Sequence, residues 1–300
     1  AFNFALFALE EFDLSRFTIP GLYFEIGGRF EHQSITTPAA PDYSDDTFSI
    51  SGGFRYEFLE NYSVGILGYR NVRQPSADEL FSDGPHLAIG VFQIGDPSLK
   101  PEAGSGGELS FRRQGDRIEF GASAFITSYD RFIAFVPTGM VDPDEGLPIF
   151  RYIADDALFY GFEVDAHATL WEYAGYSIGL TSVFDFTRGR LLNPGRNVPR
   201  MPPFTLVAAL ELQSERVDFS LQTKYAARQS KTTAFEFKTS DYVLFNLNLE
   251  VRPFLNRPEL SLFLRGRNLT NIEAREATSF LKDFAPLPGR DIRLGASLTF

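Results

Sequence analysis

The C-terminal segment of the chain constrains its fold more strongly than any other segment. Between Asp291 and Phe300, apolar side chains occupy every second position, and Asp, Arg, Gly, Ser and Thr occupy the positions between them. A period of two is typical of a strand with one apolar and one polar face, and it is incompatible with a helix. The edge of such a last strand needs a partner, which closure of the sheet into a barrel would supply.

The same alternation recurs upstream and predicts about thirteen strands. The expected strands are residues 1–9, 22–31, 47–58, 62–70, 103–113, 117–129, 157–169, 176–186, 204–213, 217–228, 242–252, 259–268 and 289–300. One face of each strand is expected to contact lipid. The side chains predicted on that face include Phe48, Ile50, Phe54, Val64, Ile66, Phe120, Phe162, Val164, Leu206, Phe219, Leu221, Leu247, Leu262, Leu294 and Leu298.

The connections between these segments alternate in length. Short turns are expected around Ser15, Glu60–Asn61, Gly115, Glu172, Glu215 and Asn256–Arg257. Long loops are expected at residues 34–46, 71–101, 130–156, 187–202, 229–241 and 270–288. Outer-membrane barrels sort their connections in this way, with short turns on the periplasmic side and long loops outside. The sequence therefore predicts an all-β fold, an antiparallel up-and-down transmembrane β-barrel.

Composition agrees with this class and excludes others. The chain has 32 Phe and 12 Tyr, which suits aromatic girdles, and its mean hydropathy of -0.12 does not argue against a barrel. A run of about eighteen apolar residues, as a transmembrane helix needs, does not occur in the sequence. The formal net charge of -11 makes nucleic acid an unexpected partner. There is no cysteine, so disulfides and thiolate metal sites are excluded.

Residues 73–102 predict an ordered loop. Ser76, with Glu79 three residues later, forms a capping-box pattern for a short helix that ends near Phe81. Turns are expected at residues 83–85 and 95–97, because Asp, Gly and Pro follow one another there. An ordered loop of about thirty residues on a barrel is usually functional.

This loop and three further segments resemble the TonB-dependent outer-membrane receptors. In that family a PSxxELF segment precedes GPH, and GDPSLKPE opens the next strand, as in residues 75–102 here. The segment at 199–204, PRMPPF, is similar to an extracellular segment of the family. The segment at 160–164, YGFEV, is similar to a strand that recurs in the family. Residues 268–300, with PLPGR and the terminal aromatic Phe300, resemble the end of such barrels, most closely in the branch that includes zinc-type receptors.

The resemblance implies that residues 1–300 are a receptor barrel domain, the C-terminal part of a barrel of roughly 22 strands. The plug and the first strands would then be missing upstream, together with the residues that contact TonB. The start at Ala1, without a methionine, is interpreted in the same way. The implied function is TonB-energised uptake of a scarce ligand, such as a siderophore or metal chelate, in the bacterial outer membrane. Besides lipid, the barrel assembly machinery is an implied partner, through Phe300.

Candidate site residues come mainly from the long loop. Asp78, Asp83 and His86 are the predicted polar contacts for a ligand, whereas Glu79 is expected to be occupied in the helix cap. His86, with Asp83 nearby, is also a candidate metal ligand, since imidazole and carboxylate form cation sites, but a loop histidine in a local hydrogen bond is the more common explanation. The zinc-type branch would have a histidine where this chain has Ala277.

A second metal candidate lies on one strand. Glu163, Asp165 and His167 occupy alternate positions and share a face, which is expected to line the lumen. A polar lumen wall needs such residues in any case. The other lumenal charged residues, namely Arg55, Glu57, Asp291 and Arg293, are interpreted as contacts of the wall or plug.

Three rival functions remain open at this point. An enzyme is not expected, because the one strand histidine, His167, has no serine within two positions on its face, and no cofactor is implied. A passive porin would explain the barrel but not the long ordered loop. A soluble all-β binding protein is the third alternative.

Overall fold

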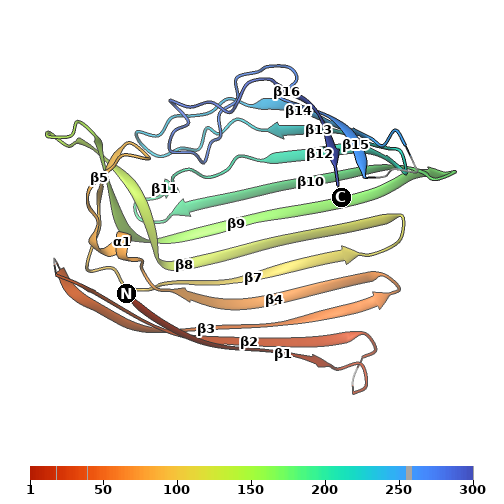
Figure 1. Cartoon of the computed structure of the whole chain (residues 1–300). Coiled ribbons are helices and arrows are strands. Elements are labelled where there is room, and N and C mark those ends of the chain that lie inside the picture. The colour runs from red at the N-terminus through yellow and green to blue at the C-terminus, as the bar shows by residue number, and fades with distance from the viewer. Residues whose placement is uncertain (18, 39, 255–258, 300) are drawn as a thin grey trace.

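The fold is a single curved sheet whose main strands are antiparallel (Figure 1). The computed structural model describes residues 1–17, 19–38, 40–254 and 259–299. Within these residues, thirteen strands are hydrogen-bonded in the order β1-β2-β3-β4-β7-β8-β9-β10-β12-β13-β14-β15-β16. Three short strands lie off this path: β5 and β6 form a hairpin that joins β9, and β11 pairs with β10. The up-and-down all-β prediction, including its count of main strands, is confirmed.

Five strands, namely β2, β3, β8, β9 and β10, extend well beyond their predicted ends toward the long-loop rim. The bounds of all the strands are β1 Phe2–Asp13, β2 Leu22–Thr37, β3 Ala40–Leu59, β4 Tyr62–Arg73, β5 Asp83–His86, β6 Val91–Ile94, β7 Glu102–Arg113, β8 Ile118–Val141, β9 Pro148–Tyr173, β10 Tyr176–Leu191, β11 Arg196–Asn197, β12 Thr205–Ser214, β13 Val217–Ala226, β14 Tyr242–Val251, β15 Leu260–Arg267 and β16 Asp291–Leu298. The one described helix is α1, Ala77–Phe81. Among the described residues, no helix has the length and apolar character needed to cross a membrane.

The strand register sorts the side chains onto two faces. Directly paired residues share a face of a sheet, and Leu180, Leu210, Leu221 and Leu247 follow one another across β10, β12, β13 and β14. Following such pairs from strand to strand puts every side chain of the predicted lipid-facing set on this apolar face. The opposite face carries charged and amide side chains such as Glu211, Asn248 and Arg265, which follow one another across β12, β14 and β15.

An aromatic girdle marks the short-turn end of the apolar face. Phe58, Tyr62, Phe111 and Phe120 come from β3, β4, β7 and β8, and successive ring centroids lie 6.0, 6.1 and 6.0 Å apart. Arg113 donates to the Tyr62 hydroxyl over 2.9 Å at the same level. Aromatic rings beside a polar group are the side chains that a bilayer interface favours. This row therefore indicates one border of the lipid-contacting band.

Two of the predicted long loops are wrong. Residues 34–46 and 130–156 mostly continue the β2–β3 and β8–β9 hairpins, as the pairs Ser34↔Ser44 and Val141↔Pro148 show. The sequence did not reveal these extensions because bulges break the alternation, between Tyr129 and Phe132 and again between Pro137 and Val141. Outside the bilayer, moreover, neither face has to be uniformly apolar.

Two predicted turns are corrected by the structure. Residues 83–85, predicted as a turn, lie in strand β5, and the chain reverses after His86 instead. The turn expected at Glu172 lies at Ala174 and Gly175, both with positive φ. The turn expected at Asn256–Arg257 and the terminal Phe300 lie outside the described residues, so those predictions are not tested.

Three clusters of buried apolar residues lie at the long-loop rim. One cluster contains Leu80, Leu99, Ile35, Tyr43 and Ile133, and joins residues 74–101 to the β2–β3 and β8–β9 hairpins. A second cluster packs Leu191, Val198 and Met201 against Ala134, Val136 and Ala157. A third folds residues 270–288 back onto β13 and β14. Packing of this kind makes the rim an ordered structure and not a set of free loops.

Candidate functional site

The segment between β4 and β7 is anchored through its helix. The predicted capping box is present: the Ser76 hydroxyl accepts the Glu79 N–H over 3.2 Å, and the Glu79 carboxylate accepts the Ser76 N–H over 2.7 Å. Leu80, on the inner face of α1, is completely buried in the apolar cluster. The assignment of Glu79 to the helix cap is therefore confirmed.

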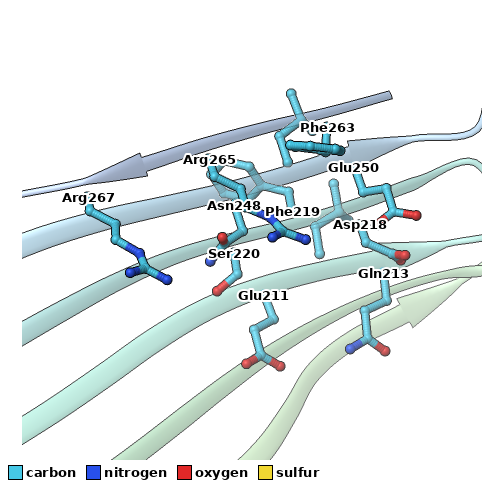
Figure 2. A pocket seen from close by; sticks show the side chains of 12 residues that line it. Glu211, Gln213, Asp218, Phe219, Ser220, Asn248, Glu250, Phe263, Arg265 and Arg267 are labelled. Atoms are coloured by element: carbon cyan, nitrogen blue, oxygen red, sulfur yellow. The ribbon is translucent and has the colours of Figure 1, made fainter. Parts of the chain in front are cut away.

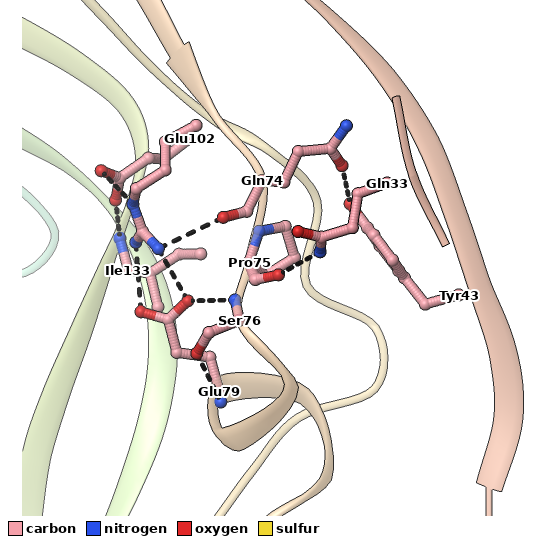
Figure 3. A network of polar contacts seen from close by, with 9 residues as sticks. Gln33, Tyr43, Gln74, Pro75, Ser76, Glu79, Glu102 and Ile133 are labelled. Carbon is pink, nitrogen blue, oxygen red and sulfur yellow. Dashed lines mark hydrogen bonds and ion pairs between the residues drawn. The ribbon is translucent and has the colours of Figure 1, made fainter. Parts of the chain in front are cut away.

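A polar network fixes the same segment to the sheet (Figure 3). Arg73 forms ion pairs with Glu79 over 2.8 Å and with Glu102 over 3.0 Å, and Glu102 also accepts the Ile133 N–H over 2.9 Å. Gln33 donates to the carbonyl of Pro75 over 2.7 Å. Both glutamates are nearly buried, and buried carboxylates are stable only when they are paired in this way. The network joins β2, β4, β7 and β8 beneath α1.

The predicted ligand contacts in this segment are all exposed. Asp78 lies in the first turn of α1, and Asp83 and His86 are the two ends of β5. The backbone carbonyl of His86 accepts the N–H groups of Ile89 and Gly90, which closes the turn to β6. These three side chains lie on one ordered rim segment and are free to meet a ligand, but their role stays a prediction.

The candidate metal residues of β9 lie on the polar face, as predicted. Asp165 is paired in register with Gly121 and Val183, and the imidazole Nδ1 of His167 lies 3.1 Å from the Thr181 hydroxyl. Within the described part of the chain, no three His, Asp or Glu side chains are grouped closely enough to hold a metal ion. The metal interpretation of these residues and of His86 therefore gains no support from the geometry.

The polar face of β12 to β15 is a wall of mixed charge (Figure 2). A shallow hollow there is lined by Glu211, Asp218, Glu250, Arg265 and Arg267, among others. Elsewhere on this face Arg55 pairs with Glu57 and with Glu11, and Arg293 pairs with Asp291 over 2.8 Å. The paired lumenal residues thus fit the expected polar wall, and the charges largely compensate one another.

A second rim site, which the sequence reasoning missed, lies where four segments meet. It comprises a cavity of about 70 Å³ lined by residues of the β8–β9 hairpin, of 199–200, of 233–237 and of 279–283. The guanidinium carbon of Arg200 lies 3.6 Å from the ring centroid of Phe280 and 6.0 Å from that of Phe135. Phe235 and Phe237, 71% and 65% exposed, flank the same cavity.

Two signals in the sequence pointed weakly to this site. Arg200 stands in the PRMPPF segment, which resembles an extracellular segment of the family. Phe235 and Phe237 are aromatic residues in an otherwise polar loop, where an exposed phenylalanine is unusual.

The architecture alone defines the class of protein. An up-and-down sheet with an apolar outer face, an aromatic girdle, a polar inner face, short turns at one end and an ordered rim at the other is the wall of an outer-membrane barrel. Within the described residues, β1 and β16 are the free edges of this sheet and do not pair with each other.

Comparison with known proteins gives the family. Residues 1–269 match the model described as "TonB dependent receptor-like, beta-barrel". The chain belongs to the TonB-dependent receptor family, whose barrels lie in the bacterial outer membrane. The resemblance seen in its sequence motifs is confirmed at this level, whereas nothing in the match singles out the zinc-type branch.

Solved structures share the fold. The copper transporter OprC superposes with a TM-score of 0.79 at 17% identity, over 99% of this chain and 48% of that one. The FrpB iron transporter from Neisseria meningitidis superposes with a TM-score of 0.72 at 16% identity, over 99% of this chain and 45% of that one. The ferric-catecholate import receptor Fiu from E. coli K12 superposes with a TM-score of 0.71 at 15% identity, over 99% of this chain and 44% of that one. The chain thus spans about half the length of these structures.

Proposed function

We propose that this chain is the C-terminal barrel portion of a receptor that takes up a scarce metal complex with energy from TonB. The observation that carries the proposal is the ordered rim: residues 74–101, the β8–β9 hairpin and the loops 187–202 and 270–288 pack against one another. Ordered loops that converge at one end of a scaffold are suited to ligand recognition. The structural neighbours named for copper, iron and ferric-catecholate transport support a metal complex as the ligand class.

The remaining parts of the proposal concern the complete protein. Residues 1–300 would be barrel throughout, and the contact with TonB would lie outside them. Asp78, Asp83 and His86 are proposed as polar contacts for the ligand, because they are exposed on the anchored segment. Phe300 is proposed as the residue that the assembly machinery reads.

Metal accumulation in cells tests this function. Cells that lack other metal receptors and carry the full-length protein are supplied with radiolabelled iron(III) or copper(II) complexes, with and without a functional TonB. We expect accumulation of at least one complex only in the presence of TonB. Accumulation that is independent of TonB would favour the alternative, a passive channel.

A further inference from the structure

The outer face of β10 changes from apolar to basic toward the long-loop rim. Phe186 is followed on the same face by Arg188 and Arg190, because alternate residues of a strand share a face. The register confirms this placement: Arg188 pairs with Tyr160 and Arg190 with Leu158, both on the apolar outer face of β9. The lipid-contacting surface of β10 therefore ends at two arginines.

The distance along the strand gives the level of these arginines in the membrane. Arg188 is the twelfth residue after Tyr176, which begins β10 at the short-turn end. At about 3.4 Å per residue and a tilt of about 40°, Arg188 lies about 31 Å from that end, against about 25 Å for an apolar band. Tyr160 and Phe186, whose ring centroids are 6.5 Å apart, are suited to the interface just below. Both arginines are thus level with the headgroups of the outer leaflet.

A lysine from a neighbouring loop extends this basic surface. The Arg188 guanidinium donates to the Asn197 side-chain oxygen over 3.1 Å, and the Asn197 amide donates to the carbonyl of Thr232 over 2.9 Å. Thr232 directly follows Lys231, which is exposed. The side chain of Asn197 thus joins β10 to the loop 229–241. Arg188, Arg190 and Lys231 together are called the basic patch below.

The basic patch lacks the acidic partners that other outward-facing charged side chains have near the rim. Arg70 pairs with Asp130 over 3.6 Å, and His32 lies 2.7 Å from Asp46. Among the described residues, by contrast, no carboxylate forms an ion pair with a member of the basic patch. Asp156, the outward acidic residue of β9 at this level, accepts a backbone N–H with its carboxylate. The patch therefore keeps its positive charge.

The surroundings of the patch determine which anion can neutralise it. The chain has a net charge of -11, so a group of three unpaired cations is a local exception that attracts anions. The patch continues directly from the apolar outer face, and hence it borders lipid and not the lumen. Arginine binds phosphate through paired N–H groups, and lysine binds it as a point charge. A lipid that carries phosphate on its headgroup combines these two requirements.

We propose that the basic patch binds the phosphate groups of a phosphorylated glycolipid of the outer leaflet, whose acyl chains pack on the apolar face beside Tyr160 and Phe186. Asn197 is a positioning residue, because it holds the Arg188 guanidinium and fixes the loop that carries Lys231. This lipid site lies on the outside of the barrel wall, so it is independent of the ligand that the receptor takes up.

Binding of lipid to the purified full-length receptor in detergent, followed by native mass spectrometry, tests the patch. The probes are a phosphorylated diglucosamine glycolipid and the same lipid without its phosphates. The Arg188→Gln, Arg190→Gln and Lys231→Gln triple variant should bind the phosphorylated probe at least about 10-fold more weakly, because charge-assisted hydrogen bonds are lost. The matched control is Arg117→Gln, an exposed arginine at the short-turn end, which should change neither affinity.

Two further variants separate charge from packing. Arg188→Lys with Arg190→Lys should keep most of the affinity for the phosphorylated probe, since lysine retains the charge. Asn197→Ala should weaken binding of that probe alone, and should have little further effect in an Arg188→Gln background. Heat-dependent migration in gels verifies that each variant forms a folded barrel.

Three results would overturn the lipid site: equal binding of the two lipids by the wild-type receptor, normal binding of the phosphorylated lipid by the triple variant, or an equal loss in Arg117→Gln. Competition separates a lipid from a free anion. Inorganic phosphate at the same concentration as the lipid should not displace it, because the acyl chains contribute to binding. Displacement would show a site for free phosphate and would also overturn the proposal.

Discussion

The apolar face of β13 offers a direct test of the membrane register. Leu221 lies four residues from Val217, the start of the strand, and is 36% exposed on the outer face. At about 3.4 Å per residue and a tilt of about 40°, this puts Leu221 about 10 Å from the level of Val217. An apolar band is about 25 Å tall, so Leu221 lies near its midplane. Leu221→Arg should therefore cost about 2 to 4 kcal/mol, the range measured at that depth.

The neighbouring residue provides a matched control. Ser220 lies on the polar face, near Asp218 and Glu250 in the wall hollow, where a new arginine meets carboxylates and water (Figure 2). Ser220→Arg should cost less than about 1 kcal/mol, as for an exposed ion pair. Both variants are measured by urea unfolding of the full-length protein in lipid vesicles. The cost expected at Leu221 alone corresponds to roughly 30- to 700-fold in the folding equilibrium constant.

The comparison has a clear refuting result. Equal destabilisation by the two substitutions would show that the two faces do not differ in polarity of environment. A larger cost at Ser220 would mean that the sheet is turned the other way round, with the charged face outward. Either result would remove the basis for the lumenal and lipid-facing assignments.

Three further predictions concern the anchored rim segment. Ser76→Ala should destabilise α1 by about 1 kcal/mol through loss of the cap, seen as faster proteolysis within residues 74–101; an unchanged rate would contradict the capping role. Leu80→Ala should destabilise the rim by about 2 to 5 kcal/mol, because the side chain is fully buried, and should broaden or lower the thermal transition. The Asp83→Ala and His86→Ala double variant should leave that transition unchanged, since both residues are exposed, but weaken binding of the metal complex that the receptor accumulates. Unchanged affinity would remove both residues from the site.

Much of the fold could be predicted from the sequence alone, because a bilayer imposes a simple rule on the strands. Every strand inside the lipid must alternate between an apolar and a polar face, so a period of two is visible wherever the chain crosses. Ile66, Phe162 and Leu294 were assigned to the correct face for that reason. The helix at residues 77–81 was equally predictable, since a capping box is a local arrangement of Ser76 and Glu79.

The rim was decided by tertiary structure. Beyond the lipid there is no bilayer to require one apolar and one polar face. The extensions of β8 and β9, which contain bulges, therefore show no regular alternation in the sequence. The pairing of Glu236 with Lys282 and the stacking of Arg200 on Phe280 join residues that are far apart in the chain. Local sequence specifies each of these side chains but not which of them meet, because that depends on how four separate loops pack.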